Sequence, residues 1–474
     1  MDTIRIDFSK ECGAVKPMHS VNNGPVYKFS EDQRITNLDH YKAAGIPYAR
    51  THDASYCDAY GGEHTVDVDF IFTDWSKDPA DPSAYDFALT DEYLRVIEAG
   101  GAKVYYRLGT KIEHWSKKYN TLPPADFHKW AVVCEHIIRH YTEGWADGHH
   151  WDIQYWEIWN EADAESTKTW AGTQKQFVDF YTVVATHLKA CFPHLKIGGC
   201  GFTGSHVDNV ISFLQAISAQ TPAVPLDFFS FHCYSATPKR PLELWQRFRT
   251  ALNELGYTDT EMLLDEWNYM GSWDSLNQPI AYHAMKDFRG ASYYAAMLCA
   301  MQSKTDIFTA SYFEATPVKE FCGIFNVGEM RVSIKNSATV VPTKGFYAFK
   351  YFNSLYRMGN EVTVDCNDDA IQVTAAAGEC GHGLLVANQG IEPVMLKISL
   401  QNVTTDVVIR LTDPVRTDSV IKTIPCENAH AVSLNLPAQS FAYIGTDLPD
   451  PVPTFDPHCY DNVSVAPPVD DIFD

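Results

Sequence analysis

The feature that most constrains the fold is an alternation of short apolar runs with longer amphipathic segments between about residues 15 and 356. Repeated strand–helix units of this kind are typical of parallel strands covered by helices. Eight units can be counted, and they predict an α/β fold, a closed (β/α)8 barrel of the TIM type. The strand candidates are Val15–Ser20, Tyr48–Thr51, Lys103–Leu108, Gln154–Trp159, Lys196–Gly199, Asp227–Phe231, Met262–Asp265 and Phe308–Tyr312. Helical patterns between them include Asp32–Ala44, Asp126–Thr142, Gln174–Ala190 and Leu242–Leu255.

A second domain is indicated by a change of pattern after about residue 357. Short alternating runs such as "EVTVDC", "AIQVTAAA" and "DVVIRL" are separated by turn residues every 8 to 12 positions, which is typical of an antiparallel β-sandwich. The alternating "TIRIDFS" near the N-terminus predicts a further strand of this sandwich. We therefore expect four parts: an N-terminal strand in 1–14, the barrel in 15–356, the sandwich in 357–446 and an extended tail in 447–474.

Composition narrows the function classes. The 474 residues are 45% hydrophobic, enough for a full core, and carry a net charge of -23, which disfavours nucleic acids and anionic membranes as partners. No segment approaches 18 uninterrupted apolar residues, and the N-terminus lacks an apolar stretch of signal-peptide length. The 12 cysteines form no CxxC pair, which predicts reduced thiols and a cytoplasmic location.

Two acidic motifs stand at the ends of predicted strands, where barrels of this type place their active sites. "YWEIWNEAD" ends the fourth strand with Asn160 and Glu161, and "LLDEWNYM" carries Glu266 at the seventh. Two carboxyl groups about 5 to 5.5 Å apart are what retaining glycoside hydrolysis requires. Trp156 or Trp159 could desolvate the acid and so raise its pKa. The alternative reading of the pair is a structural salt bridge.

Other side chains at strand ends are candidate sugar ligands, although each could instead brace the barrel. They are His52, Asp53, Asn160, His232, Tyr234, Tyr312 and Glu314. Aromatic faces available for stacking on sugars are Trp75, Trp115, Trp267, Trp273 and Tyr312. His136 and His140 lie one helical turn apart, but without an HExxH motif they predict a solvated helix face. The pair His149–His150 is expected on the surface, and no metal site is predicted.

Together, "EIWNE", "DEWN", "FHCY" and "YARTHDASYCDAYGG" resemble the clan A glycoside hydrolases, and specifically family 39, the β-xylosidases and α-L-iduronidases. The resemblance implies that Glu161 is the acid/base and Glu266 the nucleophile. It further implies that Asn160, His52, His232 and Glu314 contact the sugar and that Tyr234 lies near the nucleophile. One departure is Ala162, where the family often has proline.

These patterns predict a retaining exo-glycosidase that needs no cofactor, most simply a β-D-xylosidase acting on an oligosaccharide or glycoside. α-L-Arabinosidase or arabinofuranosidase, β-glucosidase and α-L-iduronidase activities remain alternatives. A uronic acid would need a cation, and Arg107 is expected to be buried within its strand. A non-catalytic carbohydrate-binding protein is the alternative from another class. The long segment Cys57–Asp86 is expected to narrow the mouth of the barrel. It could be contributed across a subunit interface, so a homo-oligomer is an open alternative.

Overall fold

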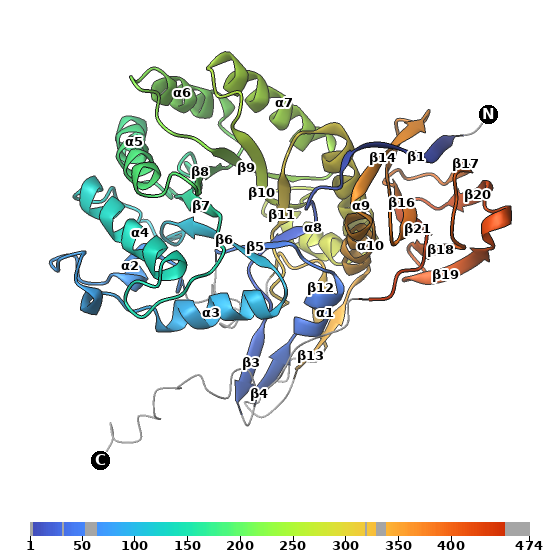
Figure 1. The fold of residues 1–474 in the computed structure, drawn as a ribbon, viewed down its shortest axis with the longest axis horizontal. Helices are drawn as coiled ribbons and strands as arrows, with labels where there is room; N and C mark the ends of the chain where they lie inside the picture. The colour runs from blue at the N-terminus through green and yellow to red at the C-terminus, as the bar shows by residue number, and fades with distance from the viewer. Residues whose placement is uncertain (1–2, 31–32, 53–63, 318–319, 329–337, 451–474) are drawn as a thin grey trace.

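Eight parallel strands close into a barrel in the computed structural model, which describes residues 3–30, 33–52, 64–317, 320–328 and 338–450 (Figure 1). Each strand pairs in parallel with both neighbours, so the predicted (β/α)8 barrel is confirmed. In chain order the strands are β2 (Ser20–Asn22), β5 (Tyr48–Arg50), β6 (Lys103–Leu108), β7 (Tyr155–Ile158), β8 (Lys196–Phe202), β9 (Phe228–Ser235), β10 (Glu261–Tyr269) and β11 (Thr309–Tyr312).

The N-terminal part of the barrel differs from the prediction. The first strand is Ser20–Asn22 and not Val15–Ser20, because residues 15–19 carry the chain across from the second domain. The backbone N–H of Val15 donates to the carbonyl of Gly359, and Lys16 Nζ donates to the carbonyl of Thr305 at 2.6 Å. The predicted helix Asp32–Ala44 is also wrong at its start, since residues 33–36 form strand β4 and the helix α1 covers only Leu38–Ala43.

Helices cover the barrel, and each buries an apolar face against the strands. α5 shows how the sequence sets a boundary: the Thr173 side chain accepts from the N–H of Gln176, and the Gln176 side chain accepts from the N–H of Thr173, which forms a capping box. The helices are α2 (Val68–Ile71), α3 (Ala88–Ala99), α4 (Phe127–Thr142), α5 (Gln174–Cys191), α6 (Val207–Ser218), α7 (Lys239–Glu254), α8 (Gln278–Met285), α9 (Phe288–Lys304) and α10 (Lys344–Met358).

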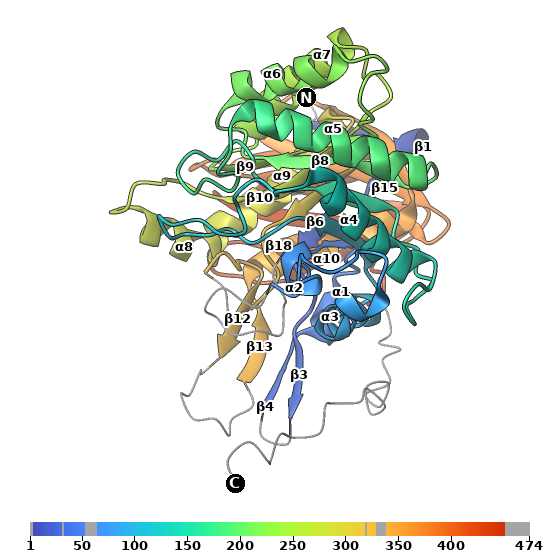
Figure 2. The same ribbon diagram turned by 90° about the vertical axis from the view of Figure 1, so that its left-hand side faces the viewer.

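A small sheet projects from the barrel, as Figure 2 shows. It joins β3 (Tyr27–Ser30) and β4 (Gln33–Thr36) to β12 (Phe325–Gly328) and β13 (Ala338–Pro342), in the order β12-β13-β4-β3. The first pair follows barrel strand β2 and the second follows β11. Because these two strands are neighbours in the barrel, segments about 300 residues apart in the chain meet in one sheet.

The second domain is a mixed sheet of nine strands in the order β19-β18-β21-β16-β15-β14-β1-β17-β20. Strand β1 (Ile4–Ala14) lies inside it, antiparallel to β14 and parallel to β17. Apolar side chains from strands along the whole sheet, such as Ile6, Leu384 and Leu434, share one core. The remaining strands are β14 (Asn360–Cys366), β15 (Ile371–Gly378), β16 (Gly381–Asn388), β17 (Val394–Gln401), β18 (Val407–Thr412), β19 (Ser419–Ile424), β20 (Ala431–Leu436) and β21 (Ser440–Gly445).

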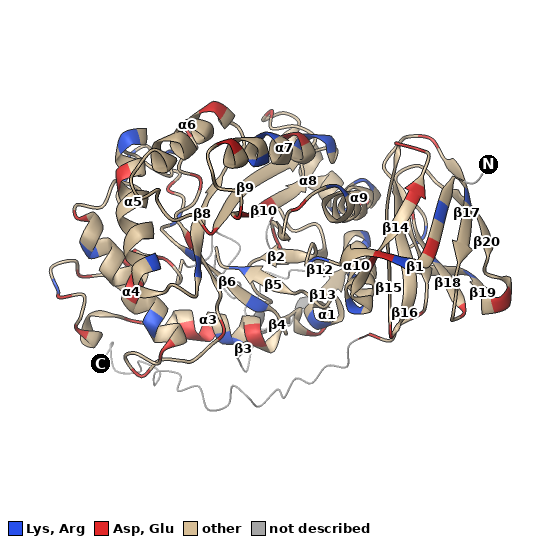
Figure 3. Cartoon of the chain, turned by 45° about the horizontal axis from the view of Figure 1, so that its top comes forward, with Lys and Arg blue, Asp and Glu red and all other residues tan. Residues whose placement is uncertain are grey.

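The surface charges are of both signs: Lys and Arg are interspersed with Asp and Glu along the helices and strands (Figure 3). The acidic residues outnumber the basic ones by 60 to 37 over the whole sequence, which gives the net charge its sign. Among the described residues, no helix is both long and apolar enough to span a membrane. The ten cysteines in the described part of the chain are all free thiols.

Candidate active site

Glu161 is presented by a strained turn at the end of β7. Trp159 and Glu161 both have left-handed backbone conformations, with φ of 73° and 49°, which cost of order 1 to 3 kcal/mol each for residues other than glycine. Backbone hydrogen bonds hold the turn: Trp159 N–H donates to the Leu108 carbonyl at 2.6 Å, and Glu161 N–H donates to the Gly201 carbonyl at 3.0 Å. The neighbouring strands β6 and β8 therefore fix the position of this carboxyl group.

Glu266 lies within β10 and is held from several sides. Arg50 Nη1 donates to Oε1 at 2.9 Å, and the Tyr234 hydroxyl donates to Oε2 at 2.7 Å. His52 Nε2 lies 3.8 Å from Oε1. The side chain is nearly buried, with 5% exposed. These contacts occupy both oxygens and fix the orientation of the carboxylate, as a nucleophile requires.

The two glutamates face each other with His232 between them. His232 Nδ1 lies 2.9 Å from Glu161 Oε1 and 3.4 Å from Glu266 Oε2. One oxygen of each glutamate and a nitrogen of His232 all lie within 4.8 Å of one another. Retaining glycosidases separate their carboxyl groups by about 5 to 5.5 Å, whereas inverting ones leave roughly 6.5 to 9.5 Å for a water. The spacing here fits the retaining arrangement.

Burial and neighbouring charges shift the pKa values of Glu161, His232 and Tyr234. Burial raises the pKa of Glu161 above its usual value, against the opposing effects of His52 and Arg50. Burial lowers the pKa of His232 to about 4, so its ring is neutral at pH 7. Burial, then the charges of Glu266 and Glu161, raise the pKa of Tyr234, which keeps its hydroxyl a donor. A carboxyl group with a raised pKa is suited to act as a general acid.

The tryptophans expected to desolvate the acid lie elsewhere. Trp156 stacks on Tyr106 with 4.9 Å between ring centroids, and Trp159 packs against Trp130 and Trp170, all in the layer between the barrel and its helices. The side chains shown to contact Glu161 and its partner are instead His232 and Tyr234. The prediction about the tryptophans is therefore wrong.

Arg50 is the central residue that the sequence did not reveal. Its guanidinium donates to Glu157 Oε2 at 2.7 Å, to Glu266 Oε1 at 2.9 Å and to Asn160 Oδ1 at 2.7 Å. The side chain is fully buried. The signal available was strand periodicity, because Arg50 and His52 are two residues apart and so point to the same face. Arg50 links the end of β7 to Glu266 on β10.

Asp265 and Glu157 share Arg50 as their only close cation among the described residues. Arg50 Nε lies 2.7 Å from Glu157 Oε2 and 3.2 Å from Asp265 Oδ2, and all three side chains are fully buried. Burial favours the neutral form of Glu157, but the charge of Arg50 and hydrogen bonds from Asp265, Ser230 and Arg50 lower its pKa to about 2. Burial and the charge of Glu157 raise the pKa of Asp265. The proton of the pair therefore resides on Asp265.

This assignment predicts unequal effects for two isosteric amides. Asp265→Asn replaces a neutral acid by a neutral amide and should change the free energy of unfolding by about 1 kcal/mol or less. Glu157→Gln leaves the Arg50 charge poorly compensated and should destabilise by about 3 kcal/mol. Urea denaturation at pH 7 measures both values. A larger loss of stability for Asp265→Asn than for Glu157→Gln would contradict the assignment of the proton to Asp265.

Asn160 and Glu314 are two further predicted residues of the site. The Asn160 amide nitrogen is buried and has no hydrogen-bond partner among the described residues, so it can donate to a sugar hydroxyl. Glu314 accepts a hydrogen bond from Asn23 Nδ2, and its charge also contributes to the raised pKa of Tyr234. Asn23, whose φ is 65°, is a second residue that sequence reasoning missed.

Gly201 closes the site from the β8 side. Its φ is 56°, and a Cβ atom there would lie 2.9 Å from His232 Nε2 and 3.2 Å from Arg50 Nη2. A side chain at this position would therefore displace the histidine or the arginine. The sequence "GGCGF" showed the glycines but not that one of them touches the catalytic groups.

Not every predicted site residue is brought together. Tyr312 is fully buried in the layer between the barrel and its helices, where its hydroxyl donates to the Phe321 carbonyl and accepts from Gly323 N–H, so its prediction as a sugar ligand is wrong. Trp267 packs in the same layer against Phe349. Asp53 lies outside the described residues. Of the proposed aromatic platforms, Trp273 does lie at the site, 5.5 Å from the Tyr234 ring and 55% exposed.

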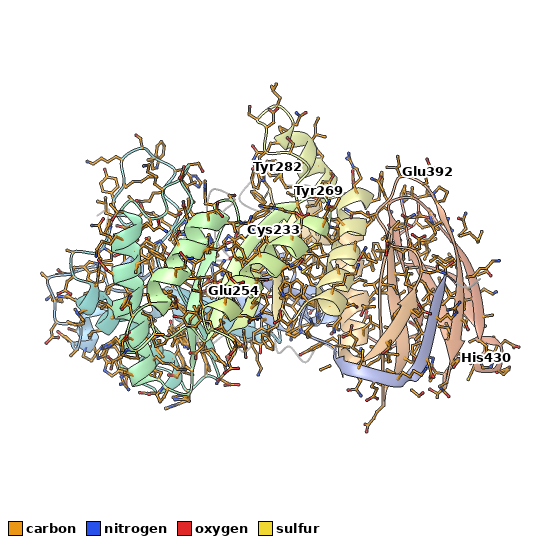
Figure 4. The ribbon with its side chains drawn as sticks, turned by 90° about the horizontal axis from the view of Figure 1, so that it is seen from above. Cys233, Glu254, Tyr269, Tyr282, Glu392 and His430 are labelled. Carbon is orange, nitrogen blue, oxygen red and sulfur yellow. The ribbon has the colours of Figure 1, made fainter. Side chains whose placement is uncertain are left out.

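A cavity of about 580 Å³ opens beside Glu161. Its lining includes Glu161, Thr203, Tyr234, Arg240 and Trp273. A small apolar cluster around α8, which includes Tyr269 and Tyr282, adjoins Tyr234 on the other side; both tyrosines are labelled in Figure 4. The cavity therefore gives a ligand access to Glu161, with the exposed indole of Trp273 in its lining.

A closed barrel with two facing carboxyl groups at its mouth is the architecture of many glycosidases, and comparison with known proteins places the chain in that class. The sequence model described as "Glycosyl hydrolases family 39" matches residues 40–407. Because this match covers more than half of the chain, the protein belongs to glycosyl hydrolase family 39 and is a glycosidase.

Individual relatives agree with this placement. A β-xylosidase from Geobacillus stearothermophilus is 25% identical over 399 residues, which cover 75% of this chain and 74% of that protein. Among solved structures, a glucosidase from Croceicoccus marinus has a TM-score of 0.73 at 21% identity, covering 95% and 99% of the two chains. A monomeric β-xylosidase from Caulobacter crescentus CB15 has a TM-score of 0.66 at 16% identity, covering 94% and 99%. These structures support the barrel with its β-rich second domain.

Proposed function

We propose that the protein is a retaining β-D-xylosidase that removes terminal sugars, with Glu266 as the nucleophile and Glu161 as the acid/base. The observation that carries the mechanism is the placement of both carboxyl groups within 4.8 Å of each other and of His232. Glu266 attacks the anomeric carbon while Glu161 gives its proton to the leaving oxygen. Water then hydrolyses the glycosyl–enzyme ester, with Glu161 as the base.

The surrounding side chains fit these roles. Tyr234 and Arg50 each donate to a different oxygen of Glu266, which keeps the nucleophile in place before attack. Neutral His232 can donate through Nδ1 to Glu161 Oε1, which leaves the other carboxyl oxygen for the proton that is transferred. The unpartnered amide of Asn160 is available for a sugar hydroxyl, a contact that strengthens in the oxocarbenium-like transition state.

The choice of xylose is supported by the similarity to the Geobacillus stearothermophilus β-xylosidase. Arg107, the cation that the sequence suggested for the carboxylate of a uronic acid, is fully buried. Its guanidinium is bound to Asp67 at 2.7 Å and to the carbonyl of Thr110. Arg107 is therefore not available to a sugar carboxylate.

A panel of 4-nitrophenyl glycosides tests the specificity. We expect the highest kcat/KM for the β-D-xyloside, lower values for the α-L-arabinosides and β-D-glucoside, and the lowest for the α-L-iduronide. Proton NMR of the first product should show the β-anomer, and xylo-oligosaccharides should release xylose from one end only. A faster glucoside or arabinoside would overturn the choice of sugar, and an inverted product would overturn the mechanism. Tight sugar binding with no turnover would instead indicate a binding protein.

A further inference from the structure

Three metal-ligating side chains converge away from the active site. Asp91 lies on α3, His140 lies on α4, and His149 lies on the loop that joins α4 to β7. One ligand atom from each residue lies within 4.8 Å of the other two. We propose that Asp91, His140 and His149 form a binding site for one Zn²⁺ ion.

The distances between the ligand atoms suit a tetrahedral ion. His140 Nε2 lies 3.2 Å from Asp91 Oδ1, and His149 Nε2 lies 3.2 Å from Asp91 Oδ2. Zinc bonds to nitrogen and oxygen of about 2.0 to 2.1 Å give a tetrahedral edge of about 3.3 Å. Each separation is close to that edge, but the two involve different oxygens of Asp91, so the side chains must shift to bring one oxygen and both nitrogens around a single ion.

The rings of both histidines are held by their surroundings. His140 Nδ1 lies 2.9 Å from the Trp145 carbonyl, to which it can donate, and Nε2 faces Asp91 Oδ1 at 3.2 Å. A backbone carbonyl on the far nitrogen is the usual partner of a zinc-bound histidine. His140 also stacks on Phe87 with 3.5 Å between ring centroids, and His149 stacks on Trp151 at 4.0 Å.

These contacts correct two sequence predictions. His140 is 2% exposed and does not lie on a solvated helix face. His149 is not a plain surface residue, because its Nε2 atom is buried and makes no hydrogen bond to the described residues. A buried nitrogen lone pair close to a carboxylate is unfavourable unless a proton or a cation lies between them. Zn²⁺ satisfies both histidines and the carboxylate at once.

Two nitrogen ligands and one oxygen ligand select the metal. Imidazole suits zinc and its neighbours in the first transition row, whereas Ca²⁺ and Mg²⁺ prefer oxygen ligands alone. The side chains of Asp91 and His149 are 16% and 18% exposed, so water can reach the fourth position. Arg95 Nη2 lies 3.8 Å from Asp91 Oδ2 and competes for the carboxylate, which limits the affinity.

The site would stabilise the fold and not take part in the reaction. His149 precedes the first residue of β7, Tyr155, whereas Glu161 follows the other end of that strand. A bound ion would attach the loop between α4 and β7 to α3. We therefore expect zinc to raise Tm while kcat for an aryl glycoside stays the same.

Metal-free protein titrated with Zn²⁺ in a calorimeter tests the proposal. A Cys191→Ala background removes a second cluster, Glu135, His187 and Cys191, that could also hold zinc. We expect one equivalent to bind, with Kd at least tenfold weaker in His149→Ala. The matched control is His150→Ala, since the adjacent His150 is exposed and outside the cluster. Its Kd should equal that of the parent.

Two results would overturn the proposal. One is equal zinc affinity in His149→Ala and His150→Ala. The other is measured without a substitution in the proposed site and so does not depend on how the variants fold. The Cys191→Ala protein loaded with Co²⁺ should show the strong visible absorption of a tetrahedral site. Its absence would mean that Asp91 and the histidines form only an ion-paired cluster.

Discussion

Glu266→Gln should lower kcat on an aryl β-D-xyloside by at least about 10⁴-fold, because the amide cannot form the glycosyl–enzyme ester. The loss should appear in kcat with little change in the free energy of unfolding, because the amide oxygen still accepts from Arg50 and the amide nitrogen can donate to the Tyr234 hydroxyl. Steady-state kinetics with 4-nitrophenyl β-D-xyloside measures the loss. Mass spectrometry of the wild-type protein after reaction with a 2-deoxy-2-fluoro xyloside should locate the trapped sugar on Glu266.

The control for this variant is Glu254→Gln. Glu254 is the last residue of α7, is exposed and is labelled in Figure 4. The Glu254→Gln substitution should leave kcat unchanged. A trapped sugar on any other carboxylate, or a Glu266→Gln enzyme with more than a hundredth of the parent activity, would contradict the assignment of the nucleophile.

Glu161→Ala should affect substrates according to their leaving groups. Xylobiose needs protonation of the departing oxygen, so its kcat/KM should fall roughly 10³-fold. A dinitrophenyl xyloside leaves without help, and its kcat/KM should fall far less. Deglycosylation is slowed as well because the base is missing. Added azide should therefore raise kcat on the activated substrate and yield a β-glycosyl azide, which chromatography and NMR identify.

The pH dependence gives this prediction a second readout. Burial raises the pKa of Glu161, and the acid works only while it holds its proton. The activity of the parent enzyme should therefore fall as the pH rises through that raised pKa, above the ordinary glutamate range. In Glu161→Ala this fall should vanish for the activated xyloside. Equal losses on both substrates, or no rescue by azide, would show that Glu161 is not the acid/base.

Most barrel strands were predictable from the sequence because their apolar runs are long and their flanks carry turn residues. Seven of the eight candidates overlap the observed strands closely, as Lys103–Leu108 does. The exception, Val15–Ser20, is largely buried but crosses between domains, and burial alone does not distinguish a strand from a buried connection. The small sheet was missed because its two hairpins pair only after the barrel has brought β2 and β11 together.

The site was predictable where acidic or polar motifs mark the end of an apolar run in the sequence. Glu161 follows the end of β7, whereas His232, Tyr234 and Glu266 lie in the C-terminal halves of β9 and β10. Arg50 is the last residue of β5 and was still missed, because nothing in the sequence indicated that its carboxylate partners come from β7 and β10. Tyr312 failed for the complementary reason, since two adjacent strand residues face opposite sides and its side lies against α9 and α10.

The position of β1 has a consequence for how the chain reaches its folded state. Residues 4–7 pair with residues 398–401, and residues 4–14 pair with residues 360–366, so the second sheet is completed by contacts that span most of the sequence. Contacts so distant in sequence are slow to form because a long loop must close first. During synthesis the first strand must wait, unpaired, while the entire barrel is made. The barrel has thus to fold as an insertion within the sheet, and its own folding brings the two parts of that sheet together.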